Sequence, residues 1–200
     1  MSLEHVTRVR GARDTGEDRL AVVPRGNGVV IAVVDGAGGT GRGARAAELA
    51  VARLAAAAQQ RELDLTAAVK ALDPQLTVLG GEAAVVVLAV TGREIRGASV
   101  GDCAAWIVAP DGAVEMLTAR QHRKPLVGGG ATVIAFHAPF AAGTLVVATD
   151  GLFSYASTGR ITAACAKDSL DAVADALMSA VELPTGGLQD DIGLVVCRRT

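Results

Sequence analysis

The sequence contains very few aromatic residues and no long apolar run. Its 200 residues include one Trp, one Tyr and three Phe, so the core must be built from Ala, Val, Leu and Ile. Scarce aromatic rings also argue against a stacking platform for single-stranded nucleic acid. No apolar run reaches the ~18 residues of a membrane-spanning helix, so we expect no membrane partner.

The sequence also lacks an excess of basic residues and a set of cysteines spaced for disulfides or metal binding. Lys and Arg number 19 against 21 Asp and Glu, which gives a formal net charge of −2. We therefore expect no nucleic-acid partner. Cys103, Cys165 and Cys197 are widely spaced and odd in number, so we expect buried thiols rather than disulfides or metal ligands. With no hydrophobic signal segment at the N-terminus, a cytoplasmic location is predicted.

The length fits a single domain over residues 1–200. An Ala-rich stretch of good helix formers predicts a helix at about 44–61. A second helix is predicted at about 65–79, with Thr66 as a cap candidate and Pro74 bending or interrupting it. Apolar residues at helical spacing predict a third helix near 168–182. Strands are predicted in blocks rather than in alternation with helices, which favours an α+β domain with two packed, mainly antiparallel sheets. The predicted strands are 19–24, 28–34, 83–90, 94–100, 103–109, 113–118, 131–136, 144–149 and 192–197.

Acidic residues stand at the ends of several predicted strands. Asp35 and Asp150 each end an apolar strand, and Asp190 and Asp191 precede the last one. An Asp-Gly pair after a strand often makes only a turn, and this simpler interpretation applies to each position alone. Acids that converge would repel one another unless cations neutralised them. Mg²⁺ and Mn²⁺ prefer such oxygen ligands and can activate water toward a phosphoryl group.

Five short motifs follow one another along the chain: 13–18 (RDTGED), 33–39 (VVDGAGG), 100–103 (VGDC), 148–153 (ATDGLF) and 190–196 (DDIGLVV). In this order they resemble the signatures of the metal-dependent protein phosphatases, the PPM family of the protein phosphatase 2C type. The resemblance spans residues 13 to 196 and is closest to short bacterial members. It implies an α-β-β-α sandwich, with two mainly antiparallel sheets flanked by helices. It also implies hydrolysis of phosphoserine or phosphothreonine in proteins by a metal-bridging hydroxide.

The resemblance also implies a set of metal ligands for two Mn²⁺ or Mg²⁺ ions. Asp35 would bridge both ions and take part in catalysis, and the Gly36 carbonyl would bind one of them. Asp150 and Asp190 would hold the other ion. Arg13 matches the phosphate-binding arginine of the family, and its guanidinium fork suits phosphate oxygens.

Three further acids match auxiliary positions of the family. Glu17 would support an ion directly or through water, and Asp18 would support the ligands from behind. Asp102, together with Asp150, matches a weaker third metal site that occurs in some members. The implied partner is a phosphorylated protein, such as a Ser/Thr kinase or its targets.

The sequence also departs from the family pattern. Ala37 stands where many members have a histidine proposed as general acid, and Cys103 replaces a common serine. The flap segment, about 119–143, is shorter than usual, which leaves substrate recognition open. Its polar residues His122, Arg123 and Lys124 could contact a phosphorylated partner or form an ordinary solvated loop.

Two other functions remain as alternatives. The run Gly36–Gly41 fits the G-x-G-x-x-G fingerprint of dinucleotide-binding proteins, although a second helical stretch follows where a parallel strand is required. A catalytically inactive phosphatase-like domain would act as a regulatory or binding module. The presence of Arg13, Asp35, Asp150 and Asp190 favours the enzyme.

Overall fold

Two antiparallel sheets pack face to face in the computed structural model, which describes residues 3–12, 16–38 and 41–199. In the β10 sheet the strand order is β1-β10-β9-β6-β7, and in the β3 sheet it is β2-β3-β4-β5-β8. The strands are β1 (Leu3–Arg10), β2 (Asp18–Arg25), β3 (Gly28–Ala37), β4 (Glu82–Thr91), β5 (Glu94–Val100), β6 (Ala104–Val108), β7 (Val114–Met116), β8 (Ile134–Pro139), β9 (Thr144–Ala148) and β10 (Ile192–Arg199).

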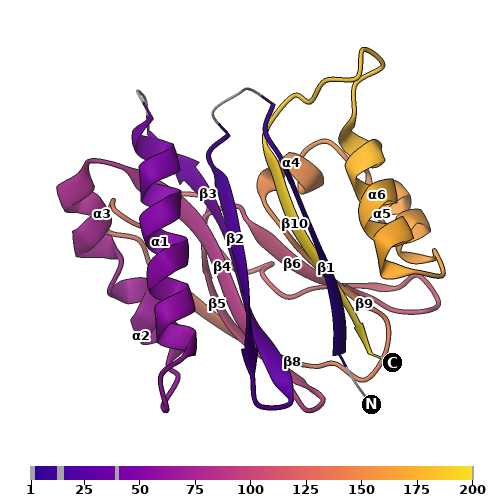
Figure 1. Ribbon diagram of the computed structural model, residues 1–200, viewed down its shortest axis with the longest axis horizontal. Helices are drawn as coiled ribbons and strands as arrows, with labels where there is room; N and C mark the ends of the chain where they lie inside the picture. The colour runs from indigo at the N-terminus through magenta and orange to yellow at the C-terminus, as the bar shows by residue number, and fades with distance from the viewer. Residues whose placement is uncertain (1–2, 13–15, 39–40, 200) are drawn as a thin grey trace.

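Helices cover the outer face of each sheet (Figure 1). The β3 sheet is covered by α1 (Arg42–Ala58), α2 (Leu65–Lys70) and α3 (Asp73–Leu79). The β10 sheet is covered by α4 (Asp150–Phe153), α5 (Thr158–Cys165) and α6 (Leu170–Val181). The expected α-β-β-α sandwich of the α+β class is therefore confirmed.

Strand β3 explains why the sheets stack in this way. Its side chains alternate: Val29, Ile31 and Val33 enter the core between the sheets, while Val30 and Val34 enter the core under α1. A strand covered on both faces needs such a continuous apolar run. The cores are mainly aliphatic, as the composition predicts, with Trp106 and Phe140 as their buried aromatic residues. All three cysteines are buried and unpaired.

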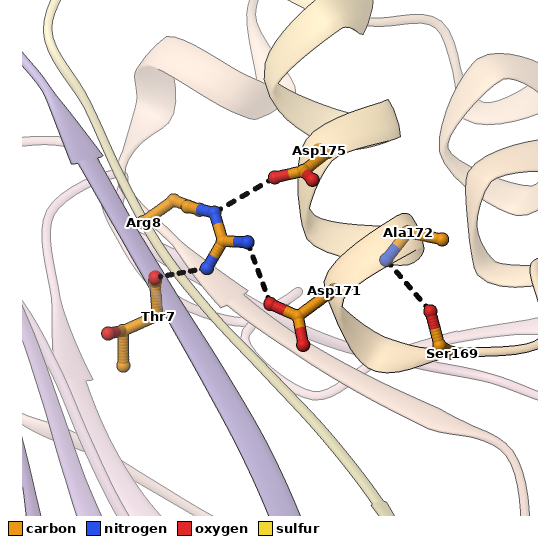
Figure 2. Close-up of polar contacts among 6 residues, drawn as sticks. All are labelled: Thr7, Arg8, Ser169, Asp171, Ala172 and Asp175. Carbon is orange, nitrogen blue, oxygen red and sulfur yellow. Dashed lines mark hydrogen bonds and ion pairs between the residues drawn. The ribbon is translucent and has the colours of Figure 1, made fainter.

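Strand β1 was missed by the sequence analysis. It is half-exposed and carries His and Arg between its apolar residues, so its pattern is weak. Its strand conformation is stabilised by backbone pairing with β10 along its whole length. Arg8 then ties it to α6, where Nε donates to Asp175 at 2.9 Å and Nη2 donates to Asp171 at 2.8 Å (Figure 2).

Other local expectations need small corrections. The predicted helix over 65–79 is divided into α2 and α3, and Pro74 lies in the first turn of α3, where its missing N–H does no harm. Helix α5 was missed. The strand expected at 131–136 corresponds to β8, which starts three residues later. It lies within the expected flap segment, about 119–143, and pairs with β5.

The run Gly36–Gly41, which starts inside β3, does not belong to a dinucleotide-binding unit. Strand β4, the next along the chain, pairs antiparallel with β3, and α1, α2 and α3 all lie between them. The dinucleotide fingerprint requires a parallel strand after a single helix, so that interpretation is wrong. In the part of the chain that the structure describes, no helix is long and apolar enough to cross a membrane.

Candidate metal centre

Acidic residues gather at one end of the sandwich, where several strands begin or end. Asp18 opens β2 and lies directly opposite Asp35 on β3. Asp18 lies on the same face of β2 as Leu20, and Asp35 lies on the same face of β3 as Val33. Leu20 and Val33 contact the core between the sheets, so both aspartates are on the faces that point toward the other sheet. On the opposite sheet, Asp150 directly follows Thr149 at the end of β9.

The electrostatics show that these acids share one site. Burial, followed by the charges of Asp18, Asp150, Asp102 and Asp190, raises the pKa of Asp35 to about 8. Burial and the charges of Asp191, Asp150 and Asp190 raise the pKa of Asp18 to about 7, while its hydrogen bond from Thr149 acts in the opposite direction. The pKa of Asp150 is raised by burial and then by the charges of Asp102 and Asp190. The structure thus brings together five of the acids that the motifs single out.

Thr149 joins the two sheets at this site. Its hydroxyl donates to Asp18 at 2.7 Å and accepts the N–H of Gly193 at 2.9 Å. Asp18 is only 3% exposed, so this bond holds a buried carboxylate in place. Within the motif 148–153 nothing in the sequence assigns a role to Thr149, because its partner Asp18 is far away in the chain.

Asp191 braces the segment that carries Glu17. Its carboxylate accepts the N–H of Ala12 at 2.7 Å and that of Glu17 at 2.5 Å. Asp190, which is exposed, accepts the N–H of Asp191 at 2.9 Å. The resemblance implies no role for Asp191, although its place next to Asp190 in the motif 190–196 could have indicated a second functional carboxylate. Arg13 lies outside the described residues.

Glycines bring Glu17 close to the end of β3. A Cβ on Gly36 would lie 2.1 Å from the carbonyl oxygen of Gly43, and a Cβ on Gly43 would lie 2.6 Å from the Glu17 carboxylate. The close approach therefore requires glycine at both positions. Gly43 lies in the first turn of α1, where the helix dipole favours a negative charge. Glu17 and Gly36 are thus neighbours, as the motif assignment expects.

The connection between β5 and β6 contributes Asp102 and Cys103. Asp102 is ion-paired with Arg123, whose Nη2 lies 3.2 Å from Oδ2. Cys103 is fully buried, and burial together with the charge of Asp35 raises the pKa of its thiol. Arg123 opposes the effect of the acids on the pKa of Asp150, so its positive charge lies close to the site.

The donor set fits a hard divalent cation. It consists of carboxylates and a backbone carbonyl, the oxygen ligands that Mg²⁺ and Mn²⁺ prefer. The raised pKa values of Asp18, Asp35 and Asp150 show that burial and mutual repulsion disfavour the ionised forms of these acids. Among the described residues, no group of three or more His, Cys, Asp or Glu side chains is already arranged to hold a metal ion. The acids thus share a site without forming a closed coordination sphere.

Comparison with known proteins agrees with this geometry. The catalytic domain of the serine/threonine phosphatase PstP, solved with two manganese ions, is 20% identical, with a TM-score of 0.83 over 98% of this chain and 97% of that one. PstP/Ppp of Mycobacterium tuberculosis is also 20% identical, with a TM-score of 0.79 over 99% of both chains. Stp1 of Staphylococcus aureus is 18% identical, with a TM-score of 0.82 over 99% of this chain and 94% of that one. At such identities the likeness establishes the fold.

Sequence comparison identifies the family. No curated protein matches the chain. The model of the family described as Stage II sporulation protein E (SpoIIE) matches residues 25–200, which include Asp35, Asp102, Asp150 and Asp190. The chain therefore belongs to the SpoIIE family and has the PPM-type phosphatase fold that its motifs predict.

Proposed function

We propose that this chain is a metal-dependent phosphatase that hydrolyses phosphoserine or phosphothreonine in a protein substrate. The observation that carries the proposal is the group formed by the buried Asp18 and the half-buried Asp35 and Asp150, whose pKa values are raised by desolvation and by nearby acids. Buried groups with perturbed pKa values cluster at functional sites. Solved proteins of the same fold are serine/threonine phosphatases, and one of them holds two manganese ions.

Asp35, Asp150, Asp190 and the Gly36 carbonyl would hold two Mn²⁺ or Mg²⁺ ions, with Glu17 and Asp18 in support. When bound, such ions supply a Lewis acid for the phosphoryl oxygens and an activated water. Asp102, together with Asp150, would support a weaker third ion. The substrate would be a phosphorylated Ser/Thr kinase or one of its targets.

The other residues of the site hold it in shape. Thr149 positions Asp18, and Asp191 braces Ala12 and Glu17 on either side of the segment that contains Arg13. Arg13 would bind the phosphate oxygens through its planar guanidinium. Ala37 has no group that can transfer a proton, so the leaving oxygen would take its proton from water or from another residue.

The test compares Asp150→Asn with Asp111→Asn. Asp111 lies in the turn after β6, at the end of that strand away from the site, where it accepts the N–H of Ala113. With Mn²⁺ and either p-nitrophenyl phosphate or a phosphothreonine peptide, Asp150→Asn should lower kcat/KM by at least about 100-fold, since even residues that support metal ligands contribute 10–100-fold. Asp111→Asn should retain the activity of the original chain.

Full activity in excess EDTA, or an unimpaired Asp150→Asn variant, would contradict the proposal. A folded protein that binds Mn²⁺ but hydrolyses neither substrate would favour the non-catalytic binding module instead. Circular dichroism of each variant checks that the fold is retained.

A further inference from the structure

The loop 119–130 is fastened over the acidic end of the sandwich on both sides of Arg123. Ahead of Arg123, the loop bonds to the connection between β5 and β6. Beyond it, the loop bonds to the start of β4 and to α3. The bonds are Gln121 Nε2 to the Cys103 carbonyl at 2.7 Å, the Gly101 N–H to the His122 carbonyl at 3.2 Å, the two Ala83–Val127 backbone bonds at 3.0 and 3.1 Å, and the N–H groups of Gly128 and Gly130 to Asp73 Oδ1 at 2.8 and 3.1 Å.

This anchoring places a cation against one of the site acids. Arg123 Nε and Nη2 lie 3.3 and 3.2 Å from Oδ2 of Asp102. Its charge also lowers the pKa of Asp150, against the upward effects of burial and of Asp102 and Asp190. Arg123 therefore supplies part of the positive charge that this side of the site lacks.

The ion pair is also easy to open. The Arg123 side chain is 74% exposed, while that of Asp102 is 24% exposed. Exposed pairs of this kind contribute little free energy, and the guanidinium can turn into water at low cost. A divalent cation carries twice the charge and is compact, so it can displace the arginine once its concentration is sufficient.

We propose that Arg123 is a tethered counter-ion of Asp102 that competes with a divalent cation for this carboxylate. The loop 119–130 thereby sets the cation affinity on the Asp102 side of the site. The inference rests on the proposed metal centre, but it concerns metal binding and not the rate of hydrolysis.

The test is calorimetric titration of the metal-free chain with MnCl₂. Arg123→Ala should tighten the weakest Mn²⁺-binding event by about fivefold, the scale of one exposed ion pair. Arg120→Ala is the matched control, because Arg120 is an exposed arginine of the same loop, and it should leave the titration unchanged. Asp102→Asn should remove the weak event, and adding Arg123→Ala to it should have no further effect.

Identical titrations of Arg123→Ala and the original chain would overturn the inference. So would an effect of Arg123→Ala that persists in the Asp102→Asn background. Absence of any Mn²⁺ binding by the original chain would overturn both this inference and the proposed function. A chain that shows the expected Mn²⁺ titrations but has no phosphatase activity would overturn the proposed function alone.

Discussion

Aspartates occupy two contrasting regions of this molecule. On α6, Asp171 and Asp175 are exposed, and each accepts a hydrogen bond from Arg8 (Figure 2). At the end of the sandwich, Asp18 and Asp35 face each other across two strands, and their charged neighbours are mainly other aspartates. The two regions have the same residue type but opposite surroundings.

The difference shows what each region does. The α6 aspartates raise the pKa of Arg8 and hold β1 against the helix, which is a structural role. The aspartates at the end of the sandwich destabilise one another when ionised, because desolvation penalises each charge and repulsion adds to it. A bound cation would make this arrangement tolerable at neutral pH. Removing the cation should therefore reveal the destabilising repulsion between the aspartates.

The largest expected effect is on the pH dependence of stability in EDTA. The folded pKa values of Asp18 and Asp35, about 7 and about 8, lie above the ordinary value of 3.8. The folded state therefore binds more protons than the unfolded state between about pH 4 and pH 8, and its stability should fall as pH rises through this range. The slope is up to about 1.4 kcal/mol per pH unit for each proton involved.

Urea unfolding at pH 5, 6, 7 and 8 measures this slope. Asp35→Asn should flatten it, and Asp171→Asn should not, because Asp171 is exposed and paired with Arg8. Stability in EDTA that is constant or that increases from pH 5 to pH 8 would remove the distinction between the two regions.

The second effect concerns stabilisation by Mn²⁺. At 100 times its dissociation constant, a ligand specific for the folded state adds about 2.7 kcal/mol to the free energy of unfolding. Asp35→Asn should lose most of this gain, whereas Asp171→Asn should retain it, because only Asp35 belongs to the group of acids at the end of the sandwich. Thermal unfolding with and without MnCl₂ measures both variants, and equal shifts for the two would contradict the assignment of Asp35.

The third effect tests the bond between the sheets. Thr149→Val removes the donor to Asp18 and leaves the buried N–H of Gly193 without its hydroxyl acceptor. We expect a loss of about 1–3 kcal/mol in the free energy of unfolding. Thr149→Ser keeps the hydroxyl and should recover most of the loss in urea unfolding. A valine variant as stable as the original chain would show that this bond is dispensable.

The smallest effect belongs to α6. Arg8→Ala removes both ion pairs shown in Figure 2, yet these partners are exposed to solvent. The free energy of unfolding should decrease by less than about 1 kcal/mol, and added salt should reduce the difference further. Urea unfolding at low and high ionic strength measures it. A loss as large as that of Thr149→Val would show that the surface pairs matter as much as the buried bond.

Most of the fold could be predicted because its signals are local. The continuous apolar run of β3 and the helical spacing of α1 and α6 lie within short stretches of chain. Strand β1 could not be predicted, since its half-exposed pattern is ordered by β10 at the other end of the chain. Helix α5 was missed for a similar reason: Ile161, Ala164 and Cys165 acquire their apolar role through a core shared with α6 and the β10 sheet.

The candidate site divides in the same way. Asp35 and Asp150 could be identified because each directly follows a recognisable strand. Other contacts could not be predicted, because no sequence pattern identifies the partner of a backbone N–H or of a loop arginine. They include the bonds of Asp191 with Ala12 and Glu17 and the ion pair of Arg123 with Asp102.

By itself, the sequence determined the layered α+β fold and the set of acids at strand ends, because strand and helix patterns depend on neighbours along the chain. Only the tertiary structure decided which of those ends meet. Asp18 and Thr149 are 131 residues apart and lie on different sheets, yet they are joined by a 2.7 Å hydrogen bond. Burial and mutual repulsion, which turn ordinary aspartates into acids with raised pKa values, exist only once the two sheets have packed together.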